Sequence, residues 1–105
     1  MPWRIEARLR EFFYNLVSLR EILTYNMSPT VFREAGFRFY FFSREEPRMH
    51  VHVHCADGEA KFWIEPRIEV AHNAGLNERQ LRAAQALVEV HVNEIRRAWQ
   101  QHFGS

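Results

Sequence analysis

The sequence predicts an α+β fold: an antiparallel β-meander of four to five strands, packed on one face by a long C-terminal helix, with an amphipathic helix at the N-terminus. Residues 3–25 repeat apolar side chains at helical spacing, residues 31–71 alternate apolar and polar side chains between turn signals, and the helical spacing returns after residue 77. A chain of 105 residues is long enough for one domain. We expect residues 27–105 to form that domain and residues 1–26 to be either a helical extension or an artefact of an upstream start site.

The first predicted element is the helix over residues 3–25. Four arginines and three glutamates surround its apolar stripe, and this balance of charge is unlike that of a membrane anchor. We therefore expect the stripe to pack on the domain or against the same helix of a second copy, which would form a homodimer. Pro29 prevents the helix from continuing. The stripe consists of Ile5, Leu9, Phe12, Leu16, Leu19 and Leu23.

Short strands separated by turn signals come next. They are rich in β-branched and aromatic side chains. Glu34-Ala35-Gly36 predicts a tight turn, and Asp57-Gly58 is a strong hairpin signal. The predicted strands cover residues 31–33, 37–43, 49–56 and 59–65, with residues 68–71 as a short edge strand and residues 44–48 as a charged connection.

The last predicted element is one helix that runs from residue 78 to the C-terminus. Asn77 is a favoured N-cap residue, and Gln80 three positions later completes a capping-box pattern. Apolar side chains then recur at helical spacing as far as Phe103. A helix of this length measures roughly 40 Å, which is enough to cross a sheet of four or five strands.

The strands around the Asp57-Gly58 turn sort their side chains into an apolar and a polar face. If Asp57 and Gly58 are the two loop residues, Cys55 faces Ala60 and His50 faces Glu65. We expect the C-terminal helix to cover the apolar face. That face comprises Phe37, Phe39, Phe41, Val51, Val53, Cys55, Ala60, Phe62 and Ile64. The polar face comprises Arg38, Tyr40, His50, His52, His54, Lys61, Trp63 and Glu65.

Three of the six histidines lie on the polar face, and imidazole is suited to metal binding and proton transfer. His50 and His52 are about 7 Å apart at Cα in a strand. With Glu65 they would form two imidazoles and a carboxylate, a ligand set that suits zinc or non-haem iron. The alternative is an ion pair between His50 and Glu65 across the strands. We expect no cofactor, with a single divalent metal ion as the alternative.

The polar face also suits RNA, because exposed aromatic rings stack on bases and cationic side chains contact phosphates. In a ribonuclease-like hydrolase, His50 or His52 would act together with Glu65 as proton acceptor and proton donor. The alternative is that the N-terminal helix covers this face and the aromatic rings form a second core. The binding residues in the RNA interpretation are Arg38, Tyr40, Lys61 and Trp63.

A protein partner is the third interpretation of the polar face, because exposed aromatic and arginine side chains are typical of interface cores. Three other residues receive simpler interpretations. His91 lies on the apolar stripe of the last helix and is interpreted as a core histidine. His72 lies near a predicted turn, where it could be a distant metal ligand, and Cys55 is interpreted as buried packing.

Charge and cysteine content exclude some classes of function. A net charge of +1 carries no signature of bulk nucleic-acid or membrane binding. The single cysteine excludes an internal disulfide and a multi-cysteine zinc site. No apolar run approaches the roughly 18 residues that a bilayer span needs. We therefore expect a cytoplasmic protein that does not bind membranes.

Several segments match a family pattern: Ser-Pro-Thr-Val-Phe-Arg at 28–33, Phe-Arg-Phe-Tyr-Phe at 37–41, His-Val-His-Val at 50–53 and Ala-Lys-Phe-Trp at 60–63. On these segments, residues 28–103 resemble the bacterial domain-of-unknown-function family 4160. The resemblance implies one component of a toxin–antitoxin-like gene pair and no established activity. We predict a small intracellular interaction module that binds RNA or a protein, such as the product of an adjacent gene, through its polar face. A small hydrolase that uses His50, His52 and Glu65 is the alternative.

Overall fold

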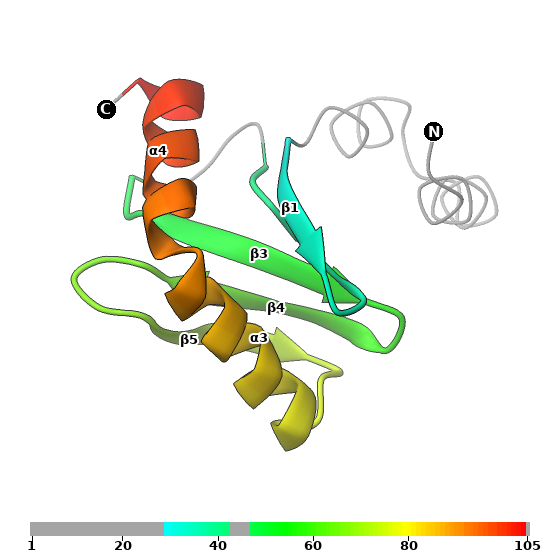
Figure 1. Cartoon of the computed structure of the whole chain (residues 1–105). Helices are drawn as coiled ribbons and strands as arrows, with labels where there is room; N and C mark the ends of the chain where they lie inside the picture. The colour runs from blue at the N-terminus through cyan, green and yellow to red at the C-terminus, as the bar shows by residue number, and fades with distance from the viewer. Residues whose placement is uncertain (1–28, 43–46, 105) are drawn as a thin grey trace, which may run out of the picture.

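Five antiparallel strands form a meander in which each strand pairs with the next one along the chain (Figure 1). The computed structural model describes residues 29–42 and 47–104. The N-terminal helix, the extension over residues 1–26 and the homodimer contact assigned to it lie outside these ranges. The predicted α+β class and antiparallel sheet are confirmed. In chain order the elements are β1 (Thr30–Glu34), β2 (Phe37–Tyr40), β3 (His50–Cys55), β4 (Gly58–Trp63), β5 (Glu69–Ala74), α3 (Glu78–Val90) and α4 (Val92–Phe103).

The first hairpin turns where the sequence predicts it. Ala35 (φ 54°) and Gly36 (φ 82°) both have left-handed backbone conformations, which is the pattern of a two-residue type I′ loop. Glu34 therefore pairs directly with Phe37. This backbone twist matches the twist of the flanking strands, and the pairing continues along β1 to Thr30 with a register shift between Thr30 and Phe32.

The second hairpin has a different register from the predicted one. Cys55 pairs with Gly58, so the loop residues are Ala56 and Asp57, and His50 pairs with Trp63 rather than with Glu65. The predicted loop at Asp57-Gly58 is wrong. The shift along β4 is two residues, an even number, so every side chain keeps its predicted face.

A close approach of the backbone explains why Gly58 lies in the strand and not in the loop. A Cβ atom at Gly58 would lie 2.3 Å from the carbonyl oxygen of Ala74 and 2.9 Å from the Cα of Gly75. A side chain is excluded at Gly75 (φ +102°) for the same reason, because a Cβ atom there would lie 2.7 Å from the carbonyl oxygen of Asp57. The start of β4 and the end of β5 thus meet through two residues that lack side chains.

Both helices cover one face of the sheet (Figure 1), and the side chains beneath them are the predicted apolar set. Phe39, Val51, Val53 and Phe62 are completely buried. The helices contribute four buried side chains to the same core: Ala84, Val88, Ile95 and Trp99. Burial on this scale is the main stabilising contribution to the fold. The predicted core face is therefore confirmed.

The C-terminal helix is two helices and not one. Its predicted start is confirmed, because the side chain of Asn77 accepts a hydrogen bond from the Gln80 backbone N–H at 2.8 Å, and Gln80 Oε1 accepts one from the Asn77 backbone N–H at 3.0 Å. The helix is interrupted at His91, where the backbone departs from helical geometry (φ −98°, ψ 15°). Within the described part of the chain, no helix is long and apolar enough to cross a membrane.

Candidate functional site

The polar face is arranged in rows of opposed side chains, because residues paired across antiparallel strands point to the same side of the sheet. His52 of β3 pairs with Tyr40 of β2 and with Lys61 of β4. Lys61 pairs in turn with His72 of β5. We call the set Tyr40, His52, Lys61 and His72 the central row. The rows on either side are His50, Trp63 and Glu69, and Arg38, His54 and Glu59.

The β2 end of this face is buried, although the sequence predicts an exposed binding surface. Tyr40 is 1% exposed and Arg38 is 3% exposed. The Arg38 Cζ lies 4.4 Å from the centre of the Tyr40 ring, and its Nε donates to Thr30 Oγ1 at 2.7 Å. The Tyr40 ring stacks on His52 with centroids 5.4 Å apart. The exposure predicted for Arg38 and Tyr40 is wrong, because both side chains are buried in the structure.

His50 is also buried, at 0% exposure. Its Nδ1 lies 2.7 Å from the carbonyl oxygen of Arg48. A carbonyl oxygen only accepts, so Nδ1 carries a proton and donates it in this contact. The imidazole also contacts Trp99 of α4 (centroids 5.2 Å) and Trp63 of β4 (5.7 Å). These contacts identify His50 as a packing residue that joins α4 to the sheet.

The accessible part of the polar face lies toward β5. A cavity of about 370 Å³ is lined there by Phe42, His52, Glu59, Ala60, Lys61 and His72. His72 is exposed, whereas His52, Lys61 and Glu59 are partly exposed. The cavity thus holds two imidazoles, an ammonium group and a carboxylate, and its volume is within the range of small-ligand sites. His52 and Lys61 were among the predicted site residues, and His72 was a lesser candidate.

Two cations flank Trp63, beside the central row. The Arg48 Cζ lies 4.1 Å from the centre of the indole and the Lys61 Nζ lies 4.4 Å from it. Both distances are within the range of cation–π attraction. Trp63 is partly exposed, so this indole is an aromatic surface that has two cationic side chains against it.

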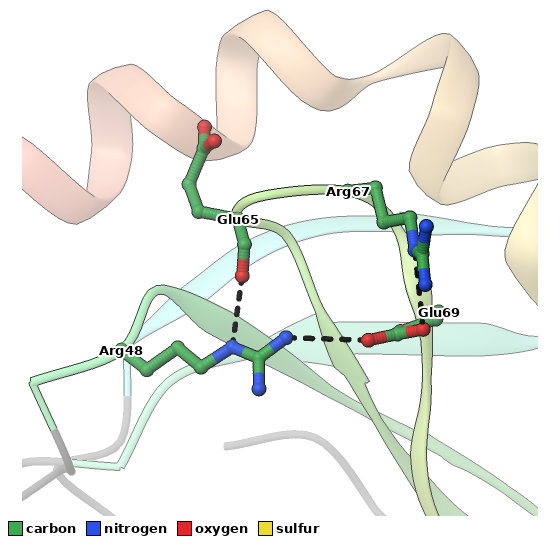
Figure 2. Close-up of polar contacts among 4 residues, drawn as sticks. All are labelled: Arg48, Glu65, Arg67 and Glu69. Atoms are coloured by element: carbon green, nitrogen blue, oxygen red, sulfur yellow. Dashed lines mark hydrogen bonds and ion pairs between the residues drawn. The ribbon is translucent and has the colours of Figure 1, made fainter.

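Arg48 is held by the connection between β4 and β5, as Figure 2 shows. Its Nε donates to the carbonyl oxygen of Glu65 at 2.8 Å, and its second guanidinium nitrogen contacts Glu69 Oε1 at 3.3 Å. The other oxygen of Glu69 accepts from Arg67 at 3.5 Å. These contacts fix the position of the guanidinium against Trp63.

Glu65 does not lie with the histidines. Its carboxylate points toward the helix in Figure 2, and its Oε1 accepts a hydrogen bond from the Nε of Arg96 in α4 at 2.8 Å. The predicted pairing of Glu65 with His50 is therefore wrong, because the register places Trp63 opposite His50. Among the described residues, no group of three or more His, Cys, Asp or Glu side chains could hold a metal ion.

The structure also contains a charged site that sequence reasoning missed. His91 Nδ1 lies 2.9 Å from Glu94 Oε1 and its Nε2 lies 2.8 Å from Glu34 Oε1. The hydrogen bond to Glu94, and next the one to Glu34, raise the pKa of His91 above its ordinary value of 6.5. The imidazole also stacks on Phe32 with centroids 4.0 Å apart. His91 is thus only in part the core histidine expected, and Glu94 three residues later is the local signal for its second role.

The chain matches a family model. The model is that of DUF4160, described as a domain of unknown function, and it matches residues 36–100. The comparisons with curated proteins and with solved structures find no match. The match spans the sheet from the first turn onward and nearly all of both helices, which is more than half of the chain, and the protein therefore belongs to the DUF4160 family.

Proposed function

We propose that this protein is a binding module for single-stranded RNA, and that Trp63, Lys61, His52 and His72 form its binding strip. The observation that carries the proposal is the cavity in which two imidazoles and the Lys61 ammonium face the same space, next to an indole flanked by two cations. Single-stranded nucleic acids are bound by this combination: an aromatic ring stacks on a base while cations contact the backbone.

Each part of the strip has a separate role in this proposal. Trp63 is partly exposed, and in this proposal one base stacks on its indole by displacing one of the two cations that lie over the ring. Lys61 adjoins both the indole and the cavity, so it can contact the phosphate next to the stacked base. His52 and His72 lie on either side of Lys61 in the central row, where they can donate hydrogen bonds to the same phosphate group.

The described surface favours RNA over a protein partner. Protein interfaces have a desolvated centre of large apolar or aromatic side chains. Among the described residues, the large apolar side chains that are exposed are Val70 (39%) in β5 and Val90 (77%) in α3. These two lie on separate elements and do not make such a centre. The burial of Tyr40 and Arg38 removes two of the residues that sequence reasoning assigned to an interface, an aromatic ring and an arginine.

A titration of labelled single-stranded RNA, followed by fluorescence anisotropy, tests the proposal. Lys61→Gln is expected to weaken binding about tenfold, because a charge-assisted contact to phosphate is lost. Trp63→Leu is expected to weaken it by a similar factor through lost stacking. In a salt titration, Lys61→Gln should also reduce the slope of log K against log salt by about 0.7, the value for one phosphate of a single strand.

Arg82→Gln is the matched control. Arg82 is exposed on α3 and forms an ion pair with Glu78, and α3 covers the apolar face of the sheet, opposite the strip (Figure 1). The Arg82→Gln substitution removes one positive charge, as Lys61→Gln does, and should leave the affinity for RNA unchanged. Circular dichroism verifies that each variant is folded. RNA binding by Lys61→Gln that equals wild-type binding at every salt concentration contradicts the proposal.

Two finer predictions from the sequence stand beside this proposal. The place in a toxin–antitoxin-like gene pair, which the family resemblance implies, stays a prediction, and co-purification with the product of the adjacent gene would test it. The hydrolase built on His50, His52 and Glu65 is not the one we favour, because His50 is buried and Glu65 is bonded to Arg96.

A further inference from the structure

We infer that the His52–Lys61–His72 part of the central row is a phosphodiester-cleaving site for RNA, an activity that goes beyond binding. The inference rests on the RNA binding proposed above. It assigns a catalytic role to His72, and it removes His50 and Glu65 from the catalytic set.

The geometry of three adjacent strands carries this inference. His52 pairs with Lys61 and Lys61 pairs with His72, so the two imidazoles lie on the same side of the sheet with the lysine between them. Neighbouring strands are about 4.8 Å apart, which separates the two histidine Cα atoms by roughly 10 Å. All three side chains line the same cavity. A phosphate above Lys61 therefore has one imidazole on each side.

This arrangement matches what cleavage of RNA by its own 2′-hydroxyl needs. One imidazole takes the proton of the 2′-hydroxyl, whose oxygen attacks the adjacent phosphorus. The bond between phosphorus and the 5′-oxygen breaks, and the second imidazole gives its proton to that leaving oxygen. The products are a 2′,3′-cyclic phosphate and a free 5′-hydroxyl, so no further reactant is consumed.

Lys61 would stabilise the charge that develops on the non-bridging oxygens during this step. Glu59 lies two residues before Lys61 in β4 and also lines the cavity. The Tyr40 hydroxyl donates to Glu59 Oε2 at 3.5 Å, which keeps that carboxylate near the β2 side of the cavity. Histidine is the side chain that both accepts and donates protons near neutral pH, so a pair of imidazoles suits both halves of the reaction.

The test uses the full chain and a single-stranded RNA oligonucleotide labelled at both ends, in a buffer with EDTA. Cleavage is expected, with a 2′,3′-cyclic phosphate at the new end of the fragment, whereas the same sequence with 2′-deoxyriboses should stay intact. His52→Gln and His72→Gln are each expected to slow cleavage about 100-fold or more. His102→Gln, an exposed histidine near the end of α4, is the matched control and should cleave like the wild type.

Binding of the deoxy oligonucleotide, measured by anisotropy, separates the two proposals. If the wild type binds RNA and does not cleave it, the catalytic inference is wrong and the binding proposal stands. If neither binding nor cleavage occurs, both are wrong. Cleavage that persists undiminished in His52→Gln and His72→Gln also overturns the inference, because it would then arise from other residues.

Discussion

At the scale of single residues, His91 shows how one side chain can connect distant parts of the fold. It receives one carboxylate from β1, Glu34, and one from the first turn of α4, Glu94. Carboxylate oxygens only accept hydrogen bonds, so both contacts are hydrogen bonds when both ring nitrogens carry protons. The charged form of His91 therefore fastens the break between α3 and α4 to the edge of the sheet.

The stability of the protein should consequently depend on pH through His91. Its folded-state pKa lies above the ordinary value of 6.5, so its contribution is complete below about pH 6.5 and is lost as the pH rises through the raised pKa. We expect His91→Gln to lose more stability relative to wild type at pH 6 than at pH 9, as measured by urea unfolding at both values. An equal loss at the two pH values would contradict this role for the imidazole.

The six histidines are chemically alike in the sequence, and only their surroundings distinguish them. The alternation of β3 correctly assigns His50, His52 and His54 to one face. It does not distinguish the buried His50 from the partly exposed His52, because that difference depends on Trp99, which lies in α4. The role of His91 depends on Glu34, 57 positions earlier. Such partners are set by the tertiary fold and leave no local pattern.

At the scale of elements, the hairpin between β3 and β4 shows why turn signals alone do not determine a register. Asp-Gly normally favours a two-residue loop, yet the loop here is Ala56-Asp57. Gly58 is needed in the strand because β5 passes too close for a side chain. The face assignment remained correct only because the error was an even number of residues. Packing against a third strand thus outweighed the local preference of the turn.

Gly58→Ala should therefore damage the pairing of β4 with β5. The new Cβ would lie 2.3 Å from a backbone carbonyl oxygen that no rotamer change can move, and overpacking of this kind costs up to about 3 kcal/mol. Gly36→Ala is the control, because no atom lies within 4 Å of its Cβ and only the left-handed φ of +82° is unfavourable, at about 1 kcal/mol. Urea unfolding gives both losses.

Amide hydrogen exchange locates the effect of these two substitutions. Gly58→Ala should accelerate exchange in β5, whereas Gly36→Ala should leave β5 as protected as in the wild type. Unchanged protection of β5 in Gly58→Ala would show that the strands do not meet as closely as the glycines indicate.

At the scale of the whole molecule, the sheet carries buried side chains on both of its faces. The apolar face was predicted from its alternation, because valine and phenylalanine have one favourable place in a half-buried strand. From the sequence, burial of the second face is only an alternative, because arginine, tyrosine and histidine usually indicate solvent exposure. Arg38 and Tyr40 are buried here, and their contacts include the Arg38 guanidinium over the Tyr40 ring and the Tyr40 ring stacked on His52, which the sequence alone does not reveal.

If both faces are cores, truncation on either face should have a similar cost. Phe39 (0% exposed) lies on the apolar face and Tyr40 (1% exposed) on the polar face of the same strand. We expect Phe39→Ala and Tyr40→Ala each to lower the free energy of unfolding by about 3–5 kcal/mol, the usual range for a buried ring. Arg97→Ala, at an exposed position of α4, should change it by less than about 0.5 kcal/mol.

The Tyr40 variant also bears on the binding strip, because its ring stacks on His52. A loss for Tyr40→Ala that is as small as the loss for Arg97→Ala would mean that the second face is open in solution. The working surface would then extend across β2 as well, as the sequence predicts. If Tyr40→Ala instead lowers the free energy of unfolding as much as Phe39→Ala does, the accessible functional groups are confined to the β4–β5 side of the face. The cavity lined by His52 and His72 lies there.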